Sequence, residues 1–169
     1  MSTSSTPSPR PESAAPPSTG IDPARAAELK AANINPRTGL ATDYLNHFNE
    51  AVMLLEMVPD MPECAEDFMG WKPLSYAEHF TASNFKARDL AIEAYNMADG
   101  RIRAEFDGIT NAITSILSAV SDAMRKASQD KTRSRLAEQA TIWVKPLVIM
   151  AGGVINGDGA ADVDYIMTH

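Results

Sequence analysis

Apolar residues recur at intervals of three and four along most of the chain, which is the spacing of one face of an α-helix. The most regular stripe predicts a helix over 101–127, and similar stripes predict helices over 40–57, 76–97 and 132–155. Sustained alternation of apolar and polar residues is absent from the sequence, so strands are not expected. The stripe of the 101–127 helix consists of Ile102, Phe106, Ile109, Ile113, Ile116, Val120 and Met124.

Local signals mark several helix ends. Asp22 followed by Pro23 is typical of a helix start, because a carboxylate caps the first turn and proline fits the first helical position. Ser75 and Glu78 form the pattern of a capping box at the start of the 76–97 helix. In the 132–155 helix the expected core stripe is Leu136, Ala140, Trp143, Leu147, Met150 and Val154.

The second half of that last helix is apolar nearly all round, which predicts a central position in the bundle. Pro146 lacks the amide for one helical hydrogen bond and is expected to kink the helix. Four long helices with short links predict an all-α fold, an antiparallel up-and-down bundle of about four long helices with a short extra N-terminal helix packed outside.

Composition divides the chain into three parts. Residues 1–22 are rich in serine, proline and threonine, which predicts a disordered tail. Residues 23–155 form the helical-bundle domain, and residues 156–169 are expected to be a flexible acidic tail. The single cysteine, Cys64, allows no internal disulfide and fits a reducing compartment. Without a secretory signal or an apolar run of about 20 residues, a cytoplasmic location is expected.

Charge restricts the partners. The 169-residue chain has a formal net charge of −7, with 44% hydrophobic and 22% charged residues. Binding to nucleic acid or to an anionic membrane requires a basic face, so neither is expected. A protein partner, or self-association through the helix 101–127 with its regular apolar stripe, is the expected interaction.

Metal-ligand residue types occur on one edge of the 40–57 helix. Asp43, His47 and Glu50 stand at i, i+4 and i+7, and therefore share that edge. They predict either half of a site for one transition-metal ion or an ordinary hydrated helix face. The flanking Asn46 and Asn49 favour the hydrated face, and no other helix carries a comparable pair. We therefore predict no cofactor.

An alternative hypothesis is a bundle with a metal or small-ligand pocket between its helices. His79 would then contribute from the next helix, with two tyrosines nearby. A third, weaker hypothesis is a phosphorelay-type bundle with an exposed His47. The candidate ligand-binding residues are Asp43, Tyr44, His47, Glu50, Tyr76 and His79.

About 25 residues around Trp71, Ser75 and Glu78 resemble one junction of the DinB-like helical-bundle family. The resemblance implies an up-and-down helical bundle. The family's metal-binding histidine would fall near Ala82, and its later pair of histidines has no counterpart here, so the resemblance does not imply a metal.

The sequence contains no glycine-rich phosphate loop and no nucleophile motif. No complete catalytic set is apparent, and the leading hypothesis is a non-enzymatic protein with an adaptor or regulatory role. It would act through protein contacts.

Overall fold

The computed structural model describes residues 22–157, and their regular secondary structure is helical apart from one isolated antiparallel β-bridge between Ile34 and Ala41. Two of the helices, α6 and α7, are long, at 27 and 26 residues. The elements are α1 (Pro23–Ala31), the 3₁₀ turn η1 (Thr42–Tyr44), α2 (Leu45–Met57), α3 (Cys64–Gly70), α4 (Tyr76–Ala82), α5 (Arg88–Met97), α6 (Gly100–Lys126) and α7 (Asp130–Ile155). The all-α prediction is confirmed.

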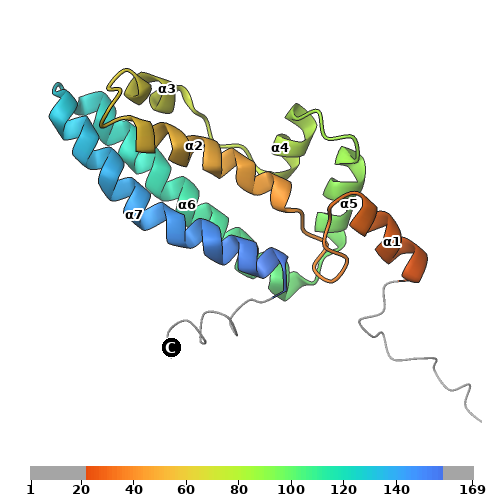
Figure 1. Cartoon of the computed structure of the whole chain (residues 1–169). Coiled ribbons are helices and arrows are strands. Elements are labelled where there is room, and N and C mark those ends of the chain that lie inside the picture. The colour runs from red at the N-terminus through yellow and green to blue at the C-terminus, as the bar shows by residue number, and fades with distance from the viewer. Residues whose placement is uncertain (1–21, 158–169) are drawn as a thin grey trace, which may run out of the picture.

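The long helices α6 and α7 pack along one another, and α2 lies beside α7 (Figure 1). The helix α3 lies against α2 and α6, whereas α1, α4 and α5 gather at the opposite end of the long pair (Figure 1). Bundle packing of long helices is therefore present. The antiparallel up-and-down order of about four long helices stays a prediction.

Large apolar side chains from α2, α3, α4 and α6 form the core between these helices. Phe48, Phe68, Phe80 and Phe106 are each fully buried. Burial of such aromatic side chains is a main contribution to the stability of the domain. The single thiol, Cys64, is also buried and free.

The predicted single helix over 76–97 is wrong, because residues 83–87 separate α4 from α5. Ser83 leaves helical geometry with an extended backbone. Its hydroxyl accepts a hydrogen bond from the amide of Phe85 at 3.3 Å. The ring of Phe85 packs edge-on against Phe80, with the centroids 5.1 Å apart. A serine that bonds to a nearby amide competes with the helix, and the aromatic contact holds the break in place.

The predicted burial of α7 is wrong in its second half. Trp143 is 52% exposed and Met150 is 37% exposed, although both belong to the expected core stripe. The buried positions that the stripe missed include Ala137, Val144 and Ala151. These residues are smaller and leave room for closely packed neighbours. The helix runs through Pro146 to Ile155 as one element, and the kink expected at Pro146 stays a prediction.

The apolar stripe of α6 is confirmed in part. Phe106, Ile113, Val120 and Met124 are buried, whereas Ile102, Ile109 and Ile116 are only partly buried at the edge of the core. The buried set also contains Thr110, Leu117 and Ser121, so the buried face is turned slightly from the predicted stripe.

The predicted tails lie almost wholly outside the described residues. Asp22 caps α1 as expected, because its carboxylate accepts a hydrogen bond from the amide of Ala24. Within residues 22–157, no helix has the length and apolar character that a membrane crossing requires.

The capping box at the start of α4 is present as predicted. The amide of Glu78 donates to Ser75 Oγ at 3.1 Å, and the amide of Ser75 donates to Glu78 Oε1 at 2.8 Å. Replacing Ser75 by alanine removes one of these bonds and should lower the free energy of unfolding by about 1 kcal/mol. Chemical denaturation tests this value, with Thr81→Ala as the control on the same helix. Equal stabilities of the two variants would contradict the expectation.

Candidate functional site

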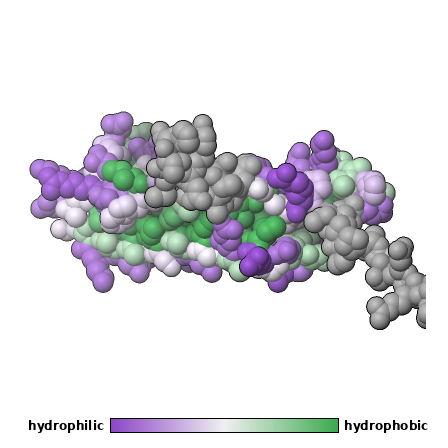
Figure 2. Space-filling model, turned by 90° about the horizontal axis from the view of Figure 1, so that it is seen from below, coloured by the Kyte–Doolittle hydropathy of each residue, from purple (hydrophilic) through white to green (hydrophobic). Residues whose placement is uncertain are grey.

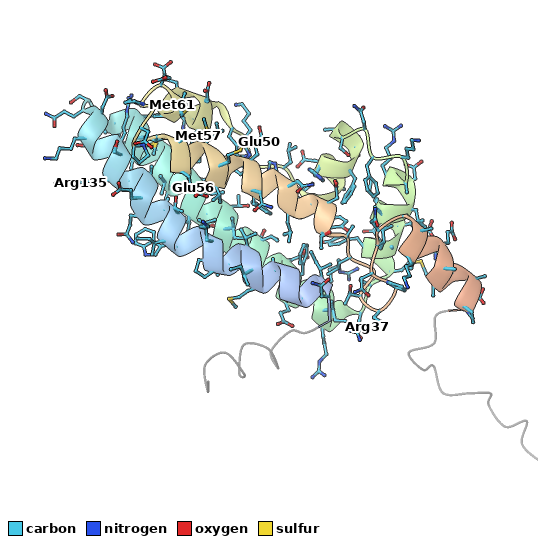
Figure 3. All side chains as sticks on the ribbon, in the orientation of Figure 1. Arg37, Glu50, Glu56, Met57, Met61 and Arg135 are labelled. Atoms are coloured by element: carbon cyan, nitrogen blue, oxygen red, sulfur yellow. The ribbon has the colours of Figure 1, made fainter. Side chains whose placement is uncertain are left out.

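All of the six predicted ligand-binding residues except Glu50 come together at the junction of α2 and α4, where Trp71 joins them. We call Tyr44, His47, Trp71, Tyr76 and His79 the histidine–aromatic cluster. His47 stacks on Trp71 with ring centroids 4.5 Å apart, and Tyr44 lies edge-on to Tyr76 and His79 at 5.2 and 5.5 Å. Asp43 borders the cluster, whereas Glu50 is exposed on α2 (Figure 3).

His47 fixes the segment 71–75 to α2. Its Nε2 accepts a hydrogen bond from the amide of Leu74 at 2.9 Å, and its backbone carbonyl accepts one from the indole of Trp71 at 3.1 Å. The Tyr44 hydroxyl donates to the carbonyl of Leu74 at 2.7 Å. Three hydrogen bonds therefore hold the segment 71–75 in place, although it belongs to no helix or sheet that would satisfy its backbone groups.

His47 is neutral in the folded protein. An Nε2 that accepts an amide hydrogen carries no proton, so the ring proton belongs on Nδ1. Burial of the ring, and secondly the charge of His79, lower the pKa of His47 to about 4. The predicted hydrated face is therefore wrong for His47, which is only 6% exposed. The same burial contradicts the exposed histidine of the phosphorelay hypothesis.

His79 Nε2 lies 2.9 Å from Asp43 Oδ2, within hydrogen-bonding distance. The side chains of His79 and Asp43 are 13% and 32% exposed. Their contact joins η1 to α4 at the surface of the cluster. The carboxylate is thereby already engaged by a partner from the same chain.

These contacts bear on the alternative hypothesis that Asp43, His47 and Glu50 are metal ligands. Residues 22–157 contain no group of three or more histidine, cysteine, aspartate or glutamate side chains that is placed to hold a metal ion. Asp43 lies within hydrogen-bonding distance of His79, and His47 accepts a hydrogen bond from the amide of Leu74. Glu50 faces solvent. The cluster is thus a packed polar core that orients one loop.

Sequence reasoning missed the second polar pair beside the cluster. The Tyr95 hydroxyl donates to both carboxylate oxygens of Asp107 at 2.7 Å, and the ring of Tyr95 stacks on Tyr76 at 4.5 Å. Burial, with the bond to Asp107, raises the pKa of Tyr95 to about 12. Nothing in the sequence pattern pairs these two residues, because they lie on different helices.

An open groove of about 780 Å³ lies next to the cluster. It is formed by the 33–37 loop, the start of α2 and the end of α7. Of the six predicted ligand-binding residues, only Asp43 lines it. Five asparagines also line the groove: Asn33, Asn35, Asn46, Asn49 and Asn156.

The second half of α7 has an outward apolar face. Ile142 is 65% exposed, Trp143 is 52% exposed, Ile149 is 70% exposed, and Met150 is 37% exposed. With Pro146 they follow the spacing of one helix face, and no charged residue interrupts it. We call these five residues the α7 face. Figure 2 shows a long apolar band on the side of the molecule where α7 lies.

Comparison with known proteins finds no matching family model, no similar curated protein and no similar solved structure. The DinB-like resemblance therefore rests on the junction around Trp71 alone.

Proposed function

We propose that the protein is a non-enzymatic contact protein, with an adaptor or regulatory role, that binds another protein surface through the α7 face. The observation that carries the proposal is the exposure of the uncharged side chains that make up the α7 face, between Ile142 and Met150. Together they offer roughly a few hundred Å² of apolar surface, which is the size of the largest apolar patch on a typical folded protein, and such a patch is often functional.

The composition of the face suits a protein interface. Tryptophan and methionine are enriched in interface cores, whereas lysine and glutamate are depleted there. Lys145 stands at the edge of the face and reaches across to Glu56 of α2, with Nζ 3.5 Å from the carboxylate. The apolar centre therefore has a polar border.

The contact surface differs from the one that the sequence favours. The apolar stripe of α6 packs against the rest of the chain, so self-association through that stripe would have to open the core. The α7 face needs no such opening. We accordingly place the proposed contact on α7.

Site-specific photo-cross-linking in cells tests the proposal. A photoreactive residue at position 149 should give a covalent adduct with a protein, and the same residue at position 97 should not. Met97 is a suitable control because it is 74% exposed but lies on α5, away from the α7 face. Equal adduct yields at both positions, or none at 149, would contradict the proposal.

A small-ligand site is the second candidate function, and the groove beside Asp43 favours it. A ligand there would be polar, because asparagine amides offer both donors and acceptors. Asp43→Asn should then lower the affinity for any ligand found in a thermal-shift screen of small polar compounds. An unchanged affinity would remove Asp43 from the site.

A further inference from the structure

We infer that the open groove beside Asp43 binds a small zwitterion, an amino acid or a short peptide with free ends. Its carboxylate would meet Arg37 and its ammonium group would meet Asp43. The inference rests on the small-ligand site given above as the second candidate function, and it adds the chemical class of the ligand. It does not involve the α7 face.

Arg37 supplies the positive charge of the groove. Its guanidinium donates a hydrogen bond to the backbone carbonyl of Asn156 at 2.8 Å, and Figure 3 shows Arg37 beside the end of α7. Arg37 forms no ion pair with a carboxylate of residues 22–157, and neither does Lys30, which also lines the groove. Because a guanidinium has several N–H donors, Arg37 retains donors for the carboxylate of a ligand.

Asp43 supplies the negative charge. The side-chain amide of Asn46 donates to Asp43 Oδ1 at 3.3 Å, and His79 Nε2 lies 2.9 Å from Oδ2. These contacts hold the carboxylate in place, and the side chain of Asp43 is still 32% exposed. A carboxylate has more lone pairs than these two contacts use, so Asp43 is able to accept a further hydrogen bond from an ammonium group.

The loop that carries Arg37 is held by contacts within the chain. The Thr38 hydroxyl donates to the carbonyl of Ile155 at 2.6 Å, and the amide of Arg37 donates to Asn35 Oδ1 at 2.8 Å. The first of these bonds ties the loop to the end of α7. A binding group that is already held in this way loses little conformational entropy when a ligand binds.

The rest of the lining suits the uncharged parts of such a ligand. The asparagine amides that line the groove offer donors and acceptors for amide groups. Apolar side chains offer a surface for the side chain of the ligand, and the ring of Phe85 is only partly buried. The volume of about 780 Å³ lies within the range of small-molecule sites. The apolar lining includes Ile34, Leu40, Leu45, Phe85 and Ile155.

The charges favour a zwitterion over other small polar molecules. A neutral sugar would pair with neither Arg37 nor Asp43. A simple anion would meet Arg37, but the carboxylate of Asp43 in the same groove and the net charge of −7 on the chain would oppose its binding. A molecule that carries both charges pairs with both side chains and has no net charge of its own.

Titration of the full chain, followed by ¹⁵N–¹H correlation NMR, tests the inference. The probes are L-phenylalanine, Gly-Phe and Gly-Gly-Phe, whose two charges lie at increasing separation. Each is added to about 10 mM, at which even a millimolar site is largely occupied. At least one probe should shift the side-chain amide signals of Asn33 and Asn49 to saturation, whereas the signal of the exposed Asn111 on α6 should not move.

The length of the probe that binds distinguishes the two sources of this chemistry. Saturation by L-phenylalanine would indicate a free amino acid, and saturation by the peptides alone would indicate a short peptide. Both results support the inference.

Blocked derivatives of the best probe test the two charges separately on the wild-type protein. N-acetylation removes the ammonium group, and amidation of the other end removes the carboxylate. Each change should raise the dissociation constant about tenfold or more, because each removes a charge-assisted hydrogen bond. This comparison does not depend on the folding of any variant.

Two variants connect each charge to its side chain. Arg37→Gln should bind the free and the amidated probe equally, and Asp43→Asn should bind the free and the acetylated probe equally. Arg125→Gln is the matched control, because Arg125 also donates to a backbone carbonyl, that of Met69 at 2.8 Å, but does not line the groove. It should retain the preferences of the wild type. Circular dichroism verifies that each variant folds.

Two results would overturn the inference. The first is the absence of saturable shifts with all three probes. The second is that both blocked derivatives bind the wild type as tightly as the free probe, which would leave the groove a small-ligand site for another class of molecule. Cross-linking at position 149 tests the α7 face independently, so neither result bears on the proposed contact there.

Discussion

Replacing Phe48 by alanine should lower the free energy of unfolding by about 3–5 kcal/mol, which is a large part of the total stability of a domain of this size. Phe48 is fully buried. Its ring centroid lies 5.1 Å from that of Tyr44 and 5.2 Å from that of His47. The substitution would leave a cavity beside the residues that hold the segment 71–75, so both the apolar contacts and the loop anchor would weaken.

Urea denaturation followed by circular dichroism measures this effect. Met53→Ala is the matched control, because Met53 lies on the same helix but is 55% exposed. A surface truncation of this kind should change the free energy of unfolding by less than about 0.5 kcal/mol. A similar loss in both variants would mean that the packing around Phe48 contributes no more than ordinary helix propensity.

Acidification from pH 7 to pH 4 should destabilise the protein through His47 by roughly 2–3 kcal/mol. The pKa of His47 is about 4 in the folded protein, against an ordinary value of 6.5. Between these values the unfolded chain binds a proton that the folded protein excludes. The contribution is therefore fully present above pH 6.5, and it is lost as the pH falls towards 4.

His47→Gln separates this effect from the titration of carboxylates. The glutamine amide oxygen is able to accept the hydrogen bond from the amide of Leu74, but glutamine does not titrate. We expect the difference in unfolding free energy between wild type and variant to shrink or change sign as the pH falls below 6.5. Two stability curves that stay parallel between pH 7 and pH 4 would contradict the prediction.

The geometry around His47 shows why the spacing of metal-ligand residue types along a helix is a weak predictor of a metal site. Asp43, His47 and Glu50 do share one edge of the chain as it enters α2, as helical periodicity requires. Their environments differ because the neighbours differ. The segment 71–75 covers His47, the histidine of α4 engages Asp43, and nothing within the described residues covers Glu50.

The sequence by itself determined the all-α class, the stripes that became α6 and α7, the Asp22 cap and the capping box of Ser75 and Glu78. These features depend on residues within one or two turns of each other, so local spacing is sufficient to specify them.

Only the tertiary structure decided which side of each helix became buried. The second half of α7 is apolar nearly all round, and a helix of that kind has no preferred inner face of its own. Packing against α2 and α6 buries Ala140, Val144 and Ala151 and leaves Trp143 and Ile149 outside.

The same reason explains the break between α4 and α5 and the state of His47. The ring of Phe80 contacts that of Phe85, and the amide of Leu74 donates a hydrogen bond to His47. These residues meet only because loops in the folded chain bring them together. Helical periodicity specifies which residues share a face. The close packing of neighbouring helices and loops decides which face meets the core.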